Sequence, residues 1–161
     1  MKQDTYLIIP ADLNASEIPD LFTQACLNET PQAVLYDPEK HSEKEAIHIV
    51  RTIQNKQTAV IIKDNIERAL SLQADGVQIV YGADIKKIKQ KIGDLALGVI
   101  CSCRDEAMRA GETGADYIGF ENEKAEELTR WWCELFTLPC VDFNPNFPSE
   151  FADFRIQTLS R

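Results

Sequence analysis

The sequence has little positive charge and no long apolar run. Lysine and arginine together number 17 against 26 aspartates and glutamates, which leaves a formal net charge of −9 at pH 7. Nucleic acids and anionic membrane surfaces attract proteins through basic patches, so neither is expected to be a partner. No apolar segment approaches the roughly 20 residues that a bilayer-spanning helix requires. The N-terminal apolar run ends at Pro10, and we interpret it as a first strand and not as a signal peptide.

Cysteine is neither frequent nor regularly spaced enough for a disulfide scaffold. The five cysteines are an odd number, so reduced thiols in a cytoplasmic protein are expected. Cys101 and Cys103 lie two residues apart at the end of a predicted strand, where zinc ligation or a redox pair is one interpretation and ordinary packing is the other. The sequence near them offers no second cysteine pair and no histidine pattern, so packing is favoured and no cofactor is expected.

Two sequence segments with the same pattern lie within residues 58–120. Each begins with an apolar run of strand length, continues as an amphipathic helix and ends in a small-residue turn before the next strand. The two turns read Ala74-Asp75-Gly76 and Gly114-Ala115-Asp116. Strands that alternate with helices of this length indicate parallel βαβ units, whose strands are apolar throughout because both of their faces are buried.

The same alternation extends over the whole chain, which we interpret as one domain of residues 1–161. The segment before the last strand is too short for a full crossover helix. An α/β fold is therefore expected, a compact (β/α)8 TIM barrel with shortened or missing C-terminal helices, and a doubly wound open sheet is the alternative. The predicted strands lie at residues 6–9, 33–36, 59–62, 77–80, 95–100, 117–120, 139–143 and 154–158.

Local signals indicate where several helices begin and which faces they bury. Ser42 followed by Glu45 is a capping-box pattern, and Asn14 or Ser16 is expected to cap a helix over residues 18–27. Trp131 and Trp132 are adjacent on a predicted helix, so they cannot both face the core. The outer tryptophan is expected near the surface, where self-association into a homo-oligomer and shielding of the helix's apolar face are the two alternatives.

The phrases KDNIERALSLQADGVQIV and GVICSCRDEAMRAGETGADYIGF resemble the thiamine-phosphate synthase family and its relative, the thiazole tautomerase. The resemblance implies a barrel enzyme that joins a hydroxymethylpyrimidine pyrophosphate to a thiazole phosphate, with Mg²⁺ holding the leaving pyrophosphate. That reaction needs carboxylates for the metal and positive groups for the phosphates.

The resemblance implies two metal candidates if the protein is catalytic. Asp64, in Lys63-Asp64-Asn65, stands at the family's metal-binding aspartate after the third strand, and a salt bridge or a helix cap is its alternative role. Asp84 lies one residue beyond the family's second metal carboxylate, and capping the following helix is its alternative role. Mg²⁺ is thus the one cofactor that the resemblance implies.

Acidic residues replace the family's positive groups after the second strand. Asp37 stands at the arginine position and Glu39 at the lysine position, so this segment would repel a pyrophosphate. After the seventh strand, Asn144-Pro145 replaces a pair of glycines that the family places against the thiazole phosphate, and proline has no N–H to offer. Neither His41 nor His48 stands at the tautomerase's catalytic position.

A divergent barrel that is non-catalytic or repurposed, binding a small molecule or a protein partner, is therefore expected. An active thiamine-phosphate synthase in thiamine biosynthesis is the alternative. Sites in this fold collect at the carboxyl ends of the strands. A ligand there would be small and not strongly anionic, and the side chains expected to line its site are Lys63, Asp64, Tyr81, Ser102 and Asn144.

Overall fold

The computed structural model describes residues 3–82, 84–144 and 151–161. Its eight strands are parallel and follow one another in chain order in a closed barrel, which confirms the predicted (β/α)8 class over the open sheet. Most of the connection expected to lack a full helix, residues 145–150, lies outside the described residues. The strands are β1 (Asp4–Ile8), β2 (Ala33–Tyr36), β3 (Ala59–Lys63), β4 (Gly76–Val80), β5 (Ala96–Ile100), β6 (Tyr117–Phe120), β7 (Cys140–Asp142) and β8 (Phe154–Thr158).

Six helices accompany these strands within the described residues, and none of them is long and apolar enough to cross a membrane. The strand bounds, and those of the helix predicted over residues 18–27, agree with the structure to within two residues. The helices are α1 (Ile18–Asn28), α2 (Glu43–Asn55), α3 (Ile66–Ser71), α4 (Ile85–Ile92), α5 (Arg104–Thr113) and α6 (Ala125–Leu135).

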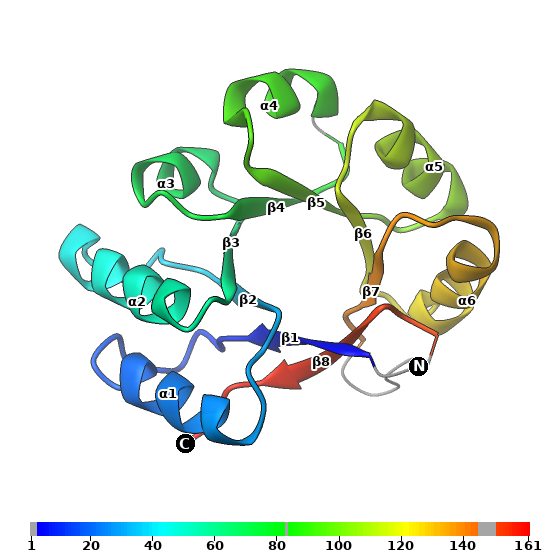
Figure 1. Ribbon diagram of the computed structural model, residues 1–161. Coiled ribbons are helices and arrows are strands. Elements are labelled where there is room, and N and C mark those ends of the chain that lie inside the picture. The colour runs from blue at the N-terminus through cyan, green and yellow to red at the C-terminus, as the bar shows by residue number, and fades with distance from the viewer. Residues whose placement is uncertain (1–2, 83, 145–150) are drawn as a thin grey trace. The chain divides into compact units, whose positions relative to one another are not determined.

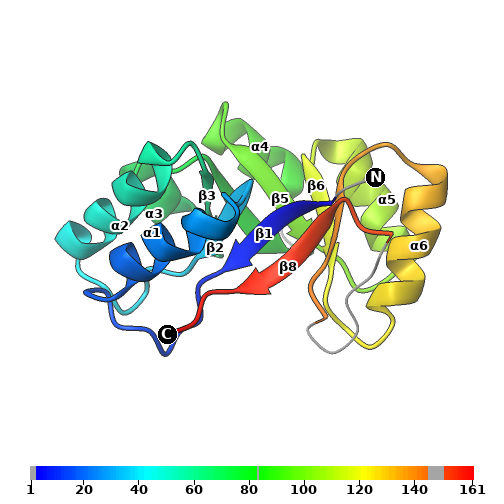
Figure 2. The ribbon, with the colours of Figure 1, turned by 60° about the horizontal axis from the view of Figure 1, so that its bottom comes forward.

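The chain divides into two compact units. The N-terminal unit comprises Thr5–Val77 and Gln157–Arg161, and the C-terminal unit comprises Gln78–Ile156 with the residues up to Asp4. In the N-terminal unit α1, α2 and α3 lie outside the strands, and in the C-terminal unit α4, α5 and α6 do so (Figure 1). Helices α5 and α6 lie side by side in both views (Figure 1, Figure 2). One domain over residues 1–161 stays a prediction.

The aspartates of the small-residue turns hold the beginnings of the neighbouring strands. In each case the aspartate's own N–H donates to the carbonyl of a strand residue, and that residue's N–H donates back to the aspartate's carboxylate. Such reciprocal bonds satisfy backbone groups at a strand start. The aspartates of these Ala-Asp turns therefore have a structural role. The pairs are Asp75 with Val60, Asp116 with Leu97 and Asp153 with Cys140, with N–H to carboxylate distances of 2.8, 2.7 and 2.8 Å.

Helix α2 begins with the predicted capping box. The Ser42 N–H donates to the Glu45 carboxylate at 2.9 Å, and the Glu45 N–H donates to the Ser42 hydroxyl at 3.1 Å. These bonds satisfy two backbone donors that the first turn of a helix leaves without intrahelical partners. The expected caps of α1 are wrong, because Glu17 occupies the cap position without a side-chain capping bond. Its carboxylate instead accepts from the Asn14 backbone and side chain.

Ser42→Ala is expected to lower the free energy of unfolding by about 1 kcal/mol, since it removes the side-chain half of the box. Hydrogen bonds from Ser42 lower the pKa of Glu45, so the stability that this carboxylate adds is present above its unfolded pKa. That stability is lost as the pH falls through the lowered value, and the effect of the substitution should shrink in acid. Urea unfolding at several pH values measures this.

The matched control is Ser71→Ala, because Ser71 is exposed and donates to the Arg68 carbonyl within the last turn of α3. It should change stability by less than about 0.5 kcal/mol. An effect of Ser42→Ala no larger than that of the control would contradict the importance of the box.

Candidate functional site

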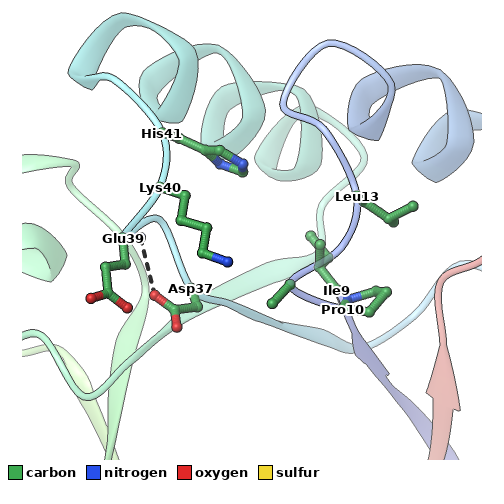
Figure 3. Close-up of a pocket in the computed structure, with 8 residues that line it drawn as sticks. Ile9, Pro10, Leu13, Asp37, Glu39, Lys40 and His41 are labelled. Carbon is green, nitrogen blue, oxygen red and sulfur yellow. Dashed lines mark hydrogen bonds between the residues drawn. The ribbon is translucent and has the colours of Figure 1, made fainter.

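The loops that follow β1 and β2 enclose a pocket of about 190 Å³ in the N-terminal unit. Its apolar wall comes from the β1–α1 loop, and its polar wall comes from the β2–α2 loop, which carries Lys40 and His41 opposite (Figure 3). Parallel strands place their carboxyl ends at one edge of the sheet, so consecutive loops of this kind meet there. The lining residues are Ile9, Pro10, Ala11, Leu13, Asp37, Glu39, Lys40 and His41.

Two carboxylates and one ammonium group line this pocket. Asp37 accepts a hydrogen bond from the Glu39 N–H at 3.1 Å, so its side chain shapes the turn that carries Glu39 and Lys40 (Figure 3). The acids that stand at the family's arginine and lysine positions thus face the pocket together with one cation. With histidine neutral, the lining carries a net negative charge, which suits a ligand with little negative charge of its own.

A buried phenol orients the histidine of the pocket. The Tyr36 side chain is fully buried, its hydroxyl lies 2.6 Å from Nδ1 of His41, and the two rings stack with centroids 5.7 Å apart. Burial raises the pKa of Tyr36, so the phenol stays protonated and is the natural donor to Nδ1. Nε2 of His41 is then the ring nitrogen that carries the proton. Composition and spacing carried no signal for this pair.

Arg68 of α3 contacts the β2–α2 loop that carries Lys40 and His41. Its guanidinium donates to the Pro38 carbonyl at 3.0 Å and lies 3.5 Å from the Glu43 carboxylate. Its Nη2 is buried and has no hydrogen-bond partner in the described part of the chain. An arginine fixed to a loop carbonyl restricts the movement of that loop, so Arg68 helps to hold the polar wall of the pocket.

Lys63 and Asp64 end β3 in the same unit, and both side chains are exposed. Asp64 has φ at 54°, a left-handed conformation that few residues other than glycine, asparagine and aspartate adopt. The cap of α3 is Asn65, whose side chain accepts from the Arg68 N–H at 3.0 Å. Within the described residues the Asp64 carboxylate makes no hydrogen bond or ion pair. A salt-bridged or capping role for Asp64 is therefore wrong.

The other metal candidate has a structural role. Asp84 accepts from the Lys87 N–H at 3.2 Å as the N-cap of α4, which confirms the alternative interpretation of this residue. Tyr81, at the end of β4, lies with Asp84 and Arg109 along a surface hollow of about 390 Å³ between α4 and α5. Arg109 forms an exposed ion pair with Asp105 at 3.0 Å.

Ser102 and Asn144 are brought together through a residue that the sequence did not indicate. Asn122 donates from Nδ2 to the Ser102 carbonyl at 3.3 Å, and Asn144 donates from Nδ2 to the Asn122 carbonyl at 3.4 Å. The Ser102 hydroxyl donates to Glu106 at 2.9 Å. Ser102 also lines a hollow of about 360 Å³ that includes Arg104 and Lys124. These contacts link the ends of β5, β6 and β7.

The predicted site residues thus belong to two units. Lys63 and Asp64 lie in the N-terminal unit, whereas Tyr81, Ser102 and Asn144 lie in the C-terminal unit. The two cysteines that follow β5 differ in environment, since Cys101 is buried and Cys103 is exposed. In the described ranges no group of three or more histidine, cysteine or acidic side chains is arranged to hold a metal ion.

Solved structures share the fold. A thiamine phosphate pyrophosphorylase from Pyrococcus furiosus superposes with a TM-score of 0.75 over 96% of this chain and 85% of its own, at 19% identity. A mutant tryptophan synthase α-subunit from the same organism reaches 0.72 over 97% of this chain and 86% of its own, at 9% identity. Similarity at this level of identity establishes the barrel architecture alone.

Curated relatives are similar over part of the chain. A thiamine-phosphate synthase of Erythrobacter litoralis is 37% identical over 101 residues, which are 52% of this chain and 46% of the relative. One from Geobacillus kaustophilus is 39% identical over 83 residues, 50% of this chain and 38% of the relative. The chain therefore matches less than half the length of these relatives.

A family model described as thiamine monophosphate synthase matches residues 5–122, which is most of the chain. The matched range contains the β1–β2 pocket, Asp64 and the end of β5. The chain belongs to the thiamine monophosphate synthase family.

Proposed function

We propose that the protein acts on thiamine precursors as a thiamine-phosphate-synthase-type transferase. The observation that carries the proposal is Asp64, whose exposed carboxylate stands at the family's metal position without a partner in the described residues. Its left-handed backbone, at φ 54°, is of the kind that clusters at functional sites. Family membership and the names of the curated relatives support the same reaction class.

Asp64 fits a magnesium ion as a single protein carboxylate. Mg²⁺ keeps several waters and is held by one or two carboxylates together with substrate phosphates, so a protein cage of three or more ligands is not required. Bound there, the ion would neutralise charge on the leaving pyrophosphate. Asp64 would hold the ion, and Lys63 beside it and Lys40 in the pocket would attract the phosphates. Asp84 is occupied as a helix cap.

A second candidate is a non-catalytic or repurposed barrel that binds a small molecule of low negative charge or a protein partner. Asp37 and Glu39 in the β1–β2 pocket favour it, because they stand where the family carries two cations. The same acids predict that a transferase of this kind binds the pyrophosphate substrate more weakly than a protein with the family's cations would.

The test is an assay of thiamine phosphate formation from hydroxymethylpyrimidine pyrophosphate and thiazole phosphate with Mg²⁺. Asp64→Asn should lower kcat/KM by about a hundredfold, because it removes a charge that acts at the reacting phosphates. Asp84→Asn is the matched control: asparagine caps helices as well as aspartate does, so activity and stability should both be kept.

The outcomes separate the candidates. Product formed by the wild-type protein and lost in Asp64→Asn supports the transferase. A thermal shift with either precursor but no product supports the binding protein. If the protein gives no product and shows no thermal shift with either precursor, both candidates are refuted. Equal activity losses in the two variants would refute the assignment of Asp64.

Two further properties are proposed on chemical grounds. We place the protein in the cytoplasm, because its five cysteines are free thiols, which persist in reducing compartments. Self-association would use the surface around Trp131, and a monomer in sedimentation at micromolar concentration would refute it.

A further inference from the structure

Two thiols lie together between α6 and β7 in the C-terminal unit. Cys140 begins β7, and its Sγ lies 3.9 Å from the Thr129 hydroxyl oxygen on α6. Thr129 and Cys133 are four residues apart on this helix, so their side chains share one face. Cys133 and Cys140 are therefore neighbours at the place where α6 packs on β7. This contact lies at the start of β7, at the opposite end of the strand from Asn144.

The two thiols differ in the way that a reactive pair requires. Cys133 is half-exposed, whereas Cys140 is fully buried. Interaction with the Cys140 thiol lowers the pKa of Cys133, and interaction with Cys133 together with burial raises the pKa of Cys140. The thiolate is the nucleophilic form of cysteine, so the accessible Cys133 would react first and Cys140 would be its neighbour.

We propose that Cys133 and Cys140 form an oxidation site at which a hydroperoxide converts the two thiols into an intramolecular disulfide. The Cys133 thiolate attacks one peroxide oxygen: an S–O bond forms, the O–O bond breaks, and the other oxygen leaves and takes up a proton. Cys140 then attacks the Cys133 sulfenic sulfur: the S–S bond forms, the S–O bond breaks, and water leaves with the Cys140 proton. Two thiols are oxidised and one peroxide is reduced.

Cys101 and Cys103 differ from this pair. Burial raises the pKa of Cys101 to about 12, and its thiol donates to the Val99 carbonyl at 3.7 Å. Cys103 is exposed at the start of α5. Oxidation governed by exposure alone would therefore modify Cys103 first, which makes this residue the internal comparison for the proposed site.

Mass spectrometry tests the proposal directly, because trypsin cleaves after Arg130 and after Arg155 and so releases one peptide that contains both cysteines. The reduced wild-type protein is treated with hydrogen peroxide at low excess, alkylated and digested. The peptide of residues 131–155 should then lack two hydrogen atoms and carry no alkyl group. Further cleavage after Glu134, which lies between the two cysteines, gives two fragments that stay joined until the disulfide is reduced.

Two variants provide the controls. Cys133→Ser changes the half-exposed member, so the fold is kept, and Cys140 should then be alkylated after peroxide treatment. Cys103→Ser should form the disulfide as the wild-type protein does. Sulfinic acid at Cys133 with Cys140 still reduced, a disulfide between chains, or oxidation confined to Cys103 would each overturn the proposal. None of these readouts depends on the transferase activity.

Discussion

Replacing Trp132 by alanine is expected to lower the free energy of unfolding by about 4 kcal/mol, the largest effect of any substitution considered for this protein. The Trp132 side chain is 2% exposed, and its Nε1 donates to the Leu138 carbonyl at 2.8 Å. Its ring stacks on Phe136 with centroids 4.1 Å apart. Truncation would leave a cavity between α5 and α6 and would remove the hydrogen-bond donor from a partly buried carbonyl in the α6–β7 connection.

Trp131→Ala is the matched control, since it removes the same side chain from the adjacent position. Trp131 is only partly buried and contacts the Arg104 guanidinium from 5.0 Å and the edge of Phe136. Its loss should cost about 1 kcal/mol, because an exposed cation–π contact adds little. Chemical unfolding of both variants measures the difference, and equal losses would show that Trp132 is not the core residue of the pair.

The second large effect is expected at Gly98, in the middle of β5. Gly98 is paired with Tyr117 of β6, and the Tyr117 ring passes over it so that its hydroxyl donates to Gln78 of β4 at 2.7 Å. A methyl group at position 98 would lie 2.1 Å from a ring carbon of Tyr117. Gly98→Ala is therefore expected to cost about 3 kcal/mol, from overpacking and from loss of the buried hydrogen bond.

A double-mutant cycle decides whether the Tyr117 ring is the cause. Tyr117→Leu removes the ring that the new methyl group would meet, so Gly98→Ala should cost much less in that background. Tyr117→Phe keeps the ring and removes only the hydroxyl, so the cost of Gly98→Ala should remain. If Gly98→Ala costs the same in the leucine and tyrosine backgrounds, the clash is not the source of the instability.

Most of the fold could be predicted because its signals are local. The apolar runs of β3 and β5 and the capping box of Ser42 and Glu45 are each readable within a few neighbouring residues. Closure of the strands into a barrel was less certain, since an open parallel sheet is built from the same repeated units. The cap of α1 was mispredicted, because Asn14 bonds to Glu17 and neither Asn14 nor Ser16 caps the helix.

The sequence predicted which residues follow the strand ends, but it did not predict the contacts that these residues make. The ends of β3 and β5 were identified, but the spacing of Asp64 and Asp84 did not reveal which carboxylate is occupied. The structure assigns the capping bond to Asp84 and leaves Asp64 without a partner in the described residues. The Tyr36–His41 pair was missed, because a hydroxyl reaches an imidazole only through the path of the loop between them.

The sequence by itself determined the alternation of strands and helices, the excess of acids after β2 and the membership of the family, since these depend on residue type and order along the chain. Tertiary structure alone decided which tryptophan is buried, why position 98 is glycine, and that Cys133 meets Cys140. The physical reason is that burial and hydrogen bonding depend on how neighbouring elements pack. Packing brings together residues whose contact cannot be predicted from their spacing in the chain.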